Sequence, residues 1–335
     1  FCAKQLRPSS GSRPRRWGHC SYTLRLLLLL ISVVAFPVST LAQASRLHRL
    51  DPQTPQGLQR LLDPSKGPLP IVSGHRGGGW HGYPENCIET FEHTLSQAYS
   101  MLEIDPRYSK DGQVVVIHDA TLERTTTGTG RVADQTVAEL KDLRLKDLDG
   151  QEPDYQIPTL DEVIDWARGK TILVLDLKDV SAIDRAKIVS RMKAESFVML
   201  IVSNYKDVQA VHQLNPNIMM EVMVPNRARA EEFATLGVPW SNVVAFVGHN
   251  PPQDASLYDF IHHQGASCMI GTSRNLDRQF IAGQVDELKK LESEYRAYLA
   301  LGANIIETDI PAQLGTMLFS SARIPAELQE YFHAP

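Results

Sequence analysis

Two pairs of charged residues occupy alternate positions where short apolar runs end. One pair is Glu103 and Asp105 in "LEID", and the other is Asp176 and Lys178 in "VLDLK". Side chains alternate along a strand, so the members of each pair point the same way. Aligned carboxylates repel unless a cation lies between them, and carboxylate oxygens suit Mg²⁺ or Ca²⁺. The three carboxylates therefore predict a divalent cation site with Lys178 facing a bound anion, although a solvated strand end would explain either pair alone.

Two histidines follow β-rich runs in the same way. His75 comes after "IVSG", and His118 closes "VVVIH". An imidazole changes charge near neutral pH, so two of them at strand ends suit a general acid and a general base, whereas a lone histidine of this kind is more often structural. Arg76 offers a guanidinium fork that matches phosphate oxygens, and the glycines 77–79 would let the backbone approach an anion. Together these residues predict a phosphate site.

The segment "YPENCIETF" places Glu85 and Asn86 just before a helical pattern. Asn86 is expected to cap that helix, with Glu89 three residues later completing a capping box. Glu85 has no comparable structural role. Its carboxylate is therefore expected to point into the site.

The elements that must position these side chains are short β-rich runs that alternate with amphipathic helical patterns. Eight runs are expected as strands, at 71–74, 102–106, 171–178, 197–203, 218–224, 242–248, 266–271 and 304–309. Eight strands alternating with helices over about 250 residues indicate an α/β fold of the (β/α)8 TIM barrel type. A doubly wound sheet would alternate similarly, but the polar residues gather at the carboxyl ends of many strands, where barrel sites lie.

More than 60 residues separate the second and third expected strands. An insertion at about 107–158, with Asp111 and Gly112 in a hairpin turn, is predicted on the loop face, where ordered loops build substrate pockets. The barrel is expected over 70–322, between a Pro- and Gly-rich surface lead-in at 45–69 and a tail at 323–335. The helical pattern at 284–302 is expected to stop at Gly302.

The first 44 residues predict a secretory signal. Residues 1–25 carry six basic side chains and no acidic one, residues 26–38 are mostly apolar, and a small-residue cleavage site ends at Ala44. The apolar run is short and soon broken by Pro37, which disfavours a membrane span, although an uncleaved anchor is the alternative. Cleavage after Ala44 would leave a secreted or periplasmic protein.

The formal net charge of −5 becomes −11 without residues 1–44, because these carry six positive charges and no negative ones. Such acidity disfavours a nucleic-acid partner bound through counterion release. The expected partner is instead a small-molecule phosphodiester. Cys87 and Cys268 are expected as two buried thiols, and no oligomeric state is predicted.

Several of these motifs form an ordered series. H-R-G follows the first strand, P-E-N opens the first helix, E-x-D lies on the next strand, and K-D-G, V-x-x-H-D and R-T-T come after it. Over residues 70–311, ending in "TDIP", the chain resembles the glycerophosphodiester phosphodiesterase family. The resemblance implies a TIM barrel with a small insertion after the second strand. It further implies acid/base roles for His75 and His118, phosphate binding by Arg76, metal binding by Glu103 and Asp105, and a place for Glu85 near the metal or a substrate hydroxyl.

The chain departs from the family pattern at three places. The usual third metal ligand is a Glu in an E-x-K pattern, with the Lys facing the phosphate, and here Asp176 stands in its place before Lys178. Cys87 replaces the Thr that usually follows P-E-N. The segment "MIGTSRNLD" replaces a Trp-Thr-x-Asn pattern on the seventh strand, at the wall that would meet the substrate's alcohol group.

The resemblance implies a hydrolase that uses Mg²⁺ or Ca²⁺ to cleave glycerophosphodiesters into an alcohol and glycerol 3-phosphate. Water or the substrate's own hydroxyl would attack, with His75 expected as the base and His118 as the acid. One alternative is a lysophospholipase-D-like phosphodiesterase on the same barrel, and another is a non-catalytic glycerophosphodiester-binding protein. A metal-dependent amidohydrolase is set aside because the first strand lacks the H-x-H that such sites use.

Overall fold

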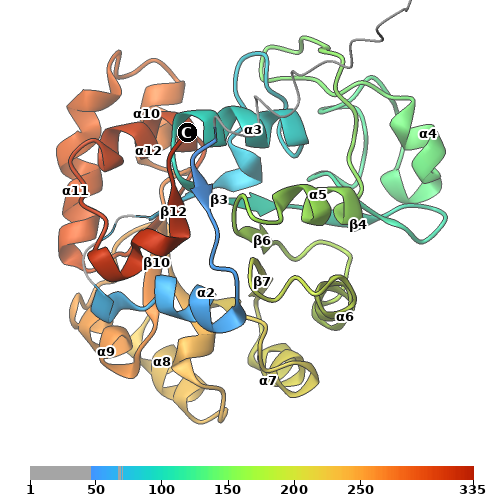
Figure 1. The fold of residues 1–335 in the computed structure, drawn as a ribbon. Coiled ribbons are helices and arrows are strands. Elements are labelled where there is room, and N and C mark those ends of the chain that lie inside the picture. The colour runs from blue at the N-terminus through green and yellow to red at the C-terminus, as the bar shows by residue number, and fades with distance from the viewer. Residues whose placement is uncertain (1–46, 67–68, 70) are drawn as a thin grey trace, which may run out of the picture. The chain divides into compact units, whose positions relative to one another are not determined.

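The computed structural model describes residues 47–66, 69 and 71–335, so the predicted signal segment lies outside the described residues. Eight parallel strands close into a barrel (Figure 1). In order around the barrel they are β2 (Ile71–Gly74), β3 (Ser100–Ile104), β6 (Leu173–Leu175), β7 (Val198–Val202), β8 (Met220–Met223), β9 (Val243–Gly248), β10 (Ser267–Gly271) and β11 (Ile305–Thr308). Because β11 pairs with β2, the sheet has no open edge. The predicted TIM barrel is confirmed, and the doubly wound alternative is wrong.

Helices connect the barrel strands and cover them from outside (Figure 1). They are α3 (Ile88–Gln97), α5 (Leu160–Ala167), α6 (Ala182–Met192), α7 (Tyr205–Leu214), α8 (Arg227–Ala234), α9 (Ser256–Gln264), α10 (Leu276–Ile281), α11 (Glu292–Leu301) and α12 (Pro311–Phe319). Several begin at a residue whose side chain accepts a backbone N–H, as Thr159 does for α5, Ser181 for α6 and Asn204 for α7. These caps fix where each helix leaves its preceding loop.

Alternation along the strands divides the buried side chains between two cores. On β3, Leu102 joins the core between strands and helices, whereas Met101 belongs to a second core inside the barrel. Glu103, two residues beyond Met101, lines a cavity inside the same barrel. Glu307 on β11 repeats this position. The barrel interior is therefore apolar toward the amino ends of the strands and acidic toward their carboxyl ends.

The segment before the barrel is not the surface lead-in that the sequence predicted. Helix α2 (Pro55–Leu61) begins after its cap Thr54, and Leu50, Leu58 and Leu61 are buried in the inner core. Strand β1 (Arg49–Leu50) pairs with β12 (Phe332–His333) of the tail, and the two segments lie side by side in Figure 1. Apolar residues three apart give α2 a face that covers the inner core. The Pro and Gly content of the segment obscured this face in the sequence.

The predicted insertion contains a hairpin and a small core of its own. Strands β4 (Pro106–Tyr108) and β5 (Val114–Val116) pair antiparallel, and the expected turn at Asp111 and Gly112 joins them. Helix α4 (Val137–Lys141) follows the short 3-10 helix η3 (Val132–Asp134). The buried members of this core are Cys87, Val115, Ile117, Leu122, Val132, Leu140, Leu145 and Ile157. Through Cys87 this core reaches the residue that precedes α3, so the insertion is packed onto the barrel.

The helical pattern predicted at 284–302 is only partly helical. The α-helix α11 begins at Glu292, after the 3-10 helix η5 (Leu288–Leu291), and it ends at Gly302 as expected. The preceding residues serve to close α10 instead, because the N–H groups of Gln284 and Val285 both donate to the carbonyl of Gln279. The other described 3-10 helices are η1 (Pro64–Lys66), η2 (His75–Gly77), η4 (Trp240–Asn242) and η6 (Ala326–Tyr331).

Cys87 and Cys268 are both buried and free, which confirms the expectation of two thiols. Burial raises the pKa of Cys87 to about 12. Among the residues that the structure describes, no helix combines the length and apolarity that crossing a membrane requires.

Candidate active site

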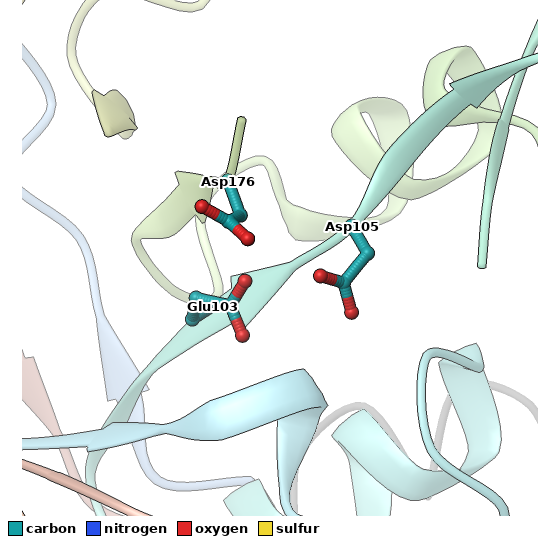
Figure 2. A group of neighbouring side chains, drawn as sticks. All are labelled: Glu103, Asp105 and Asp176. Carbon is teal, nitrogen blue, oxygen red and sulfur yellow. The ribbon is translucent and has the colours of Figure 1, made fainter. Parts of the chain in front are cut away.

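Three carboxylates meet at the carboxyl ends of the neighbouring strands β3 and β6. One oxygen from each of Glu103, Asp105 and Asp176 lies within 4.8 Å of the other two. Figure 2 shows the three carboxylates turned toward a common space. The strands remain paired here, because the Asp176 N–H donates to the carbonyl of Ile104 at 2.9 Å. Their register therefore brings acids more than 70 positions apart in the sequence onto one patch of the barrel rim.

This cluster is electrostatically unfavourable unless positive charge lies beside it. Burial, followed by the charges of Asp105 and Asp176, raises the pKa of Glu103 well above its usual value. The backbone N–H of Arg76 donates to Glu103 Oε2 at 2.8 Å, which fixes the orientation of that carboxylate. Hard oxygen donors in this arrangement suit Mg²⁺ or Ca²⁺. The donor set thus fits the divalent cation that the sequence predicted.

Lys178 lies against the same cluster. Its ammonium group is 2.9 Å from Asp105 Oδ1 and also contacts Asp176. Burial opposes the charged form, but the two carboxylates outweigh it and raise the pKa of Lys178. Lys178 lines the cavity above the cluster and is cationic there.

Asn86 does not cap α3, so the predicted capping box is wrong. The cap position is Cys87, whose side chain makes no capping hydrogen bond. Asn86 has a φ of +62° and turns its amide to Asp105 instead. Its Nδ2 donates to Asp105 Oδ2 at 2.6 Å, and its Oδ1 accepts the Asp105 N–H at 3.2 Å. Asn tolerates this left-handed backbone, and the two bonds hold a carboxylate of the cluster in place.

Both predicted histidines are oriented by carboxylates. His75 Nδ1 lies 2.6 Å from Asp309 Oδ1, and His118 Nδ1 lies 2.7 Å from Asp119 Oδ1. With a proton on Nδ1, each ring keeps Nε2 as its second site for proton transfer. Burial lowers the pKa of His75, but the hydrogen bond to Asp309 and the charge of Glu307 outweigh it, and the pKa is raised.

A chain of ion pairs joins the two histidine loops. Glu85 accepts from Arg76 Nη1 at 3.2 Å and from the two terminal nitrogens of Arg124 at 2.8 and 2.9 Å. Arg124 also holds Asp119, with Nε at 2.6 Å from Oδ2. Partial burial opposes the charged form of Glu85, but these guanidinium groups outweigh it and lower the pKa of Glu85. Glu85 points into the site as expected, and its contacts position two arginines.

The glycine run after His75 is used mainly inside the protein. Gly77 and Gly78 have φ values of +78° and +86°. A Cβ on Gly77 would lie 2.2 Å from the ring of Phe91, and one on Gly78 would lie 2.2 Å from Pro311 Cγ. Only Gly79 of the three lines the cavity. The predicted approach of backbone to an anion is therefore confined to the end of the run.

A cavity of about 620 Å³ opens above the carboxylates. The eight predicted site residues gather at this one end of the barrel. Those that line the cavity are His75, Arg76, Glu85, Glu103, His118, Asp176 and Lys178, and the eighth, Asp105, completes the carboxylate cluster.

Sequence reasoning missed other charged residues of the cavity. These are Arg124, Glu221, His249, Arg274, Arg278, Glu307 and Asp309. The sequence does contain a signal for Glu307 and Asp309, because "IIETD" ends a strand with the same E-x-D spacing as "LEID". Arg124 belongs to the R-T-T motif but received no role. Glu221 and Glu307 are buried, and burial with neighbouring acids raises the pKa of both.

Comparison with known proteins adds family relationships to this geometry. Residues 75–279 match the profile of the glycerophosphoryl diester phosphodiesterase family. A glycerophosphodiester phosphodiesterase of Bacillus subtilis (strain 168) is 28% identical over 216 residues, which are 58% of this chain and 68% of that protein.

Two solved structures extend the comparison. A glycerophosphoryl diester phosphodiesterase from Parabacteroides distasonis ATCC 8503 shares 37% identity, with a TM-score of 0.80 over 86% of this chain and 100% of that chain. A phosphodiesterase from Oleispira antarctica, solved with its product sn-glycerol-3-phosphate, is 24% identical. Its TM-score is 0.56 over 76% of this chain and 98% of that one, which shows the shared fold.

Proposed function

The chain belongs to the glycerophosphoryl diester phosphodiesterase family, and from this premise we propose that it hydrolyses glycerophosphodiesters to an alcohol and glycerol 3-phosphate in a metal-dependent reaction. It is a phosphoric diester hydrolase, as the family is. The observation that carries the finer proposal is the cluster of Glu103, Asp105 and Asp176 beneath a cavity that also holds two carboxylate-oriented histidines.

The three clustered carboxylates would hold Mg²⁺ or Ca²⁺. When bound, the cation neutralises phosphate oxygens and makes the phosphorus more open to attack. The chain prepares this site through two contacts described above, from Asn86 to Asp105 and from the Arg76 N–H to Glu103. Asp176 is one methylene shorter than the Glu that the family pattern has at this place, so its reach toward the cation is shorter.

Arg76 and Lys178 would stabilise the negative charge that grows on the phosphoryl oxygens. Both line the cavity, and both are held by carboxylates, Arg76 by Glu85 and Lys178 by the cluster. Fixed cations in a partly buried site need little rearrangement as charge develops, which is the main advantage of such a site over water. Their partners therefore act by positioning them.

The two histidines would carry the proton transfers. One takes the proton from the attacking oxygen of water or of the substrate's own hydroxyl, and the other gives a proton to the departing alkoxide as the P–O bond breaks. The raised pKa of His75 favours its protonated form. This supports His75 as the acid and leaves His118 as the base, the reverse of the assignment expected from the sequence.

A lysophospholipid substrate is a second candidate, favoured by the mouth of the cavity. Leu148, Met223 and Ile281 are large apolar side chains that line it while remaining 52%, 42% and 42% exposed. Exposed apolar side chains gathered at a cavity suit an acyl chain. A substrate panel that includes lysophosphatidylcholine distinguishes the two candidates.

Residues 1–44 support a secreted or periplasmic location, with removal of the signal after Ala44. Mass spectrometry of the exported protein is expected to find Ser45 at its amino terminus. Retention of the residues before Ser45 would favour the membrane anchor instead.

The proposal is tested by release of glycerol 3-phosphate from glycerophosphocholine and from glycerophosphoglycerol. We expect release with Mg²⁺ or Ca²⁺, none with EDTA, and a loss on the order of 10²-fold or more in Glu103→Gln. Glu294→Gln makes the same change at an exposed position on α11 and is expected to keep full activity.

Release that persists in EDTA, or full activity in Glu103→Gln, would contradict the metal-dependent mechanism. If the protein binds either diester without cleaving it, the role of a binding protein is supported instead.

A further inference from the structure

We propose that Arg274 and Arg278 bind a second anionic group, a phosphate or a carboxylate, carried by the alcohol part of the substrate. This rests on the proposed function, because it assigns the alcohol class for the same cavity. Arg274 lies in the turn after β10 and Arg278 lies on α10, and both line the cavity.

The two arginines lie across the barrel from the carboxylate cluster. Around the closed sheet, β10 is four strands from β6, which Asp176 follows, and β9 is four strands from β3. His249, which follows β9, lines the same wall as Arg274. Burial and then the positive charge of Arg274 lower the pKa of His249, so the influence of that guanidinium reaches into the cavity. A substrate whose phosphate lies at the cluster would extend toward this wall.

The charge of this pair is uncompensated, unlike that of the other cations in the cavity. Arg76 and Arg124 are paired with Glu85, and the Lys178 ammonium contacts the carboxylate cluster. In the part of the chain that the structure describes, no carboxylate lies within ion-pair distance of Arg274 or Arg278. Both side chains are exposed at the mouth and free to meet a ligand.

The nearest acid in the sequence cannot supply the missing charge. Asp277 lies between the two arginines but is fully buried. It accepts hydrogen bonds from the Tyr295 hydroxyl at 2.7 Å, the Thr308 hydroxyl at 2.9 Å and the Asp309 N–H at 2.8 Å. These bonds tie α10 to α11 and to the end of β11. The backbone beside Asp277 is thus held in place, and the buried Asp277 carboxylate does not neutralise the flanking arginines.

The substrate's own chemistry decides which half of it meets this wall. A glycerophosphodiester carries one negative charge on the phosphate that reacts, and its glycerol is uncharged. A second anion can therefore come only from the alcohol. Two guanidinium groups favour phosphate or carboxylate and repel a quaternary ammonium. The wall therefore selects an alcohol that bears an anion over choline.

The test compares substrates that differ by one anionic group. Bis(glycerophospho)glycerol adds a second phosphodiester to glycerophosphoglycerol, and glycerophosphoserine adds a carboxylate to glycerophosphoethanolamine. We expect the unaltered protein to show a kcat/KM about tenfold or more higher on the anionic member of at least one pair, and the pair identifies the anion. The preference should shrink as ionic strength rises.

Arg274→Gln/Arg278→Gln is expected to remove this preference, through KM rather than kcat, while changing kcat/KM on the less anionic members by less than about threefold. Arg323→Gln removes one such charge at an exposed position outside the cavity and should leave the preference intact. Thermal unfolding of both variants checks that the fold is kept.

No preference in the unaltered protein, or an equal loss on both members of each pair, would overturn the inference while leaving the proposed function standing. A protein that cleaves none of the four diesters overturns the proposed function, and the inference falls with it.

Discussion

His75 and His118 each rest on a carboxylate, but their environments differ. His75 lies near Glu307 as well as its partner Asp309, and its pKa is raised, whereas His118 shares Asp119 with Arg124. The two rings thus have different charged neighbours.

We therefore expect His75→Ala to lose about 10²–10⁴-fold on a diester with a poor leaving group. The loss should be far smaller on a nitrophenyl diester, because nitrophenolate leaves without a proton. His118→Ala should lose a similar factor on both substrates. With His75 as the acid, activity should also fall as pH rises through the raised pKa of His75. Steady-state rates of both variants on the two substrates test this assignment. If His118→Ala, and not His75→Ala, lost far more activity on the poor leaving group, His75 would be the base.

Single site residues were predictable from the sequence where the alternation of side chains along a strand indicates their direction. Glu103, Asp105 and Asp176 follow from that rule, and the structure brings them together. Asn86 was misassigned because an Asn before a helix suits a cap, and only the fold shows that Asp105 lies beside it. Arg124 could not be placed, since its partners lie up to 39 residues away and meet it only through the insertion.

At the scale of elements, the turn from β2 into α3 has to be compact. Gly77 has no room for a side chain because Phe91 of α3 packs against it, whereas Gly82 has the same φ of +78° with nothing within 4 Å. The two positions therefore share the backbone strain and differ only in the clash. This gives a matched pair of substitutions.

Gly77→Ala is expected to lower the free energy of unfolding by about 1–3 kcal/mol more than Gly82→Ala, through overpacking against the Phe91 ring. It should also reduce activity, because the Arg76 N–H and His75 belong to the same turn. Denaturant unfolding and hydrolysis rates measure the two effects. Equal destabilisation by the two substitutions would mean that the turn relaxes around the added methyl group.

The barrel strands were the most predictable elements, because β-rich runs bounded by turns recur eight times. The ends of elements were less so. The run at 284–302 has a helical pattern throughout, but backbone hydrogen bonds of its first residues close α10. The periodicity of this run does not indicate that its first residues close α10, because that depends on where α10 ends.

At the scale of the whole molecule, a segment that precedes the barrel in the sequence and a segment that follows it pack together at one end of the barrel. Leu58 of α2 is fully buried in a core that also holds Leu328 and Phe332 of the tail. That core lies at the opposite end from the acidic cavity. Its contribution should therefore be to stability and not to chemistry.

Leu58→Ala is expected to destabilise the protein by about 2–5 kcal/mol, because it removes methyl groups from a closed core. Leu301→Ala removes the same atoms from a side chain that is 44% exposed and should have little effect. Thermal or denaturant unfolding compares the two, and kcat/KM of the folded Leu58→Ala protein should match that of the unaltered one. An effect no larger than that of Leu301→Ala would show that the segment is dispensable for the barrel.

The two proposed proton-transfer groups come from different parts of the chain, His75 from the barrel and His118 from the insertion. If the insertion were exchanged for that of a relative, only one of the two histidines would be replaced. The hybrid protein would be active only if the residue in place of Arg124 met an acid at position 85. Directed evolution of substrate preference has more freedom on the opposite wall. Residues 274 and 278 can change there without breaking an existing pair, so new specificities are best sought in that wall.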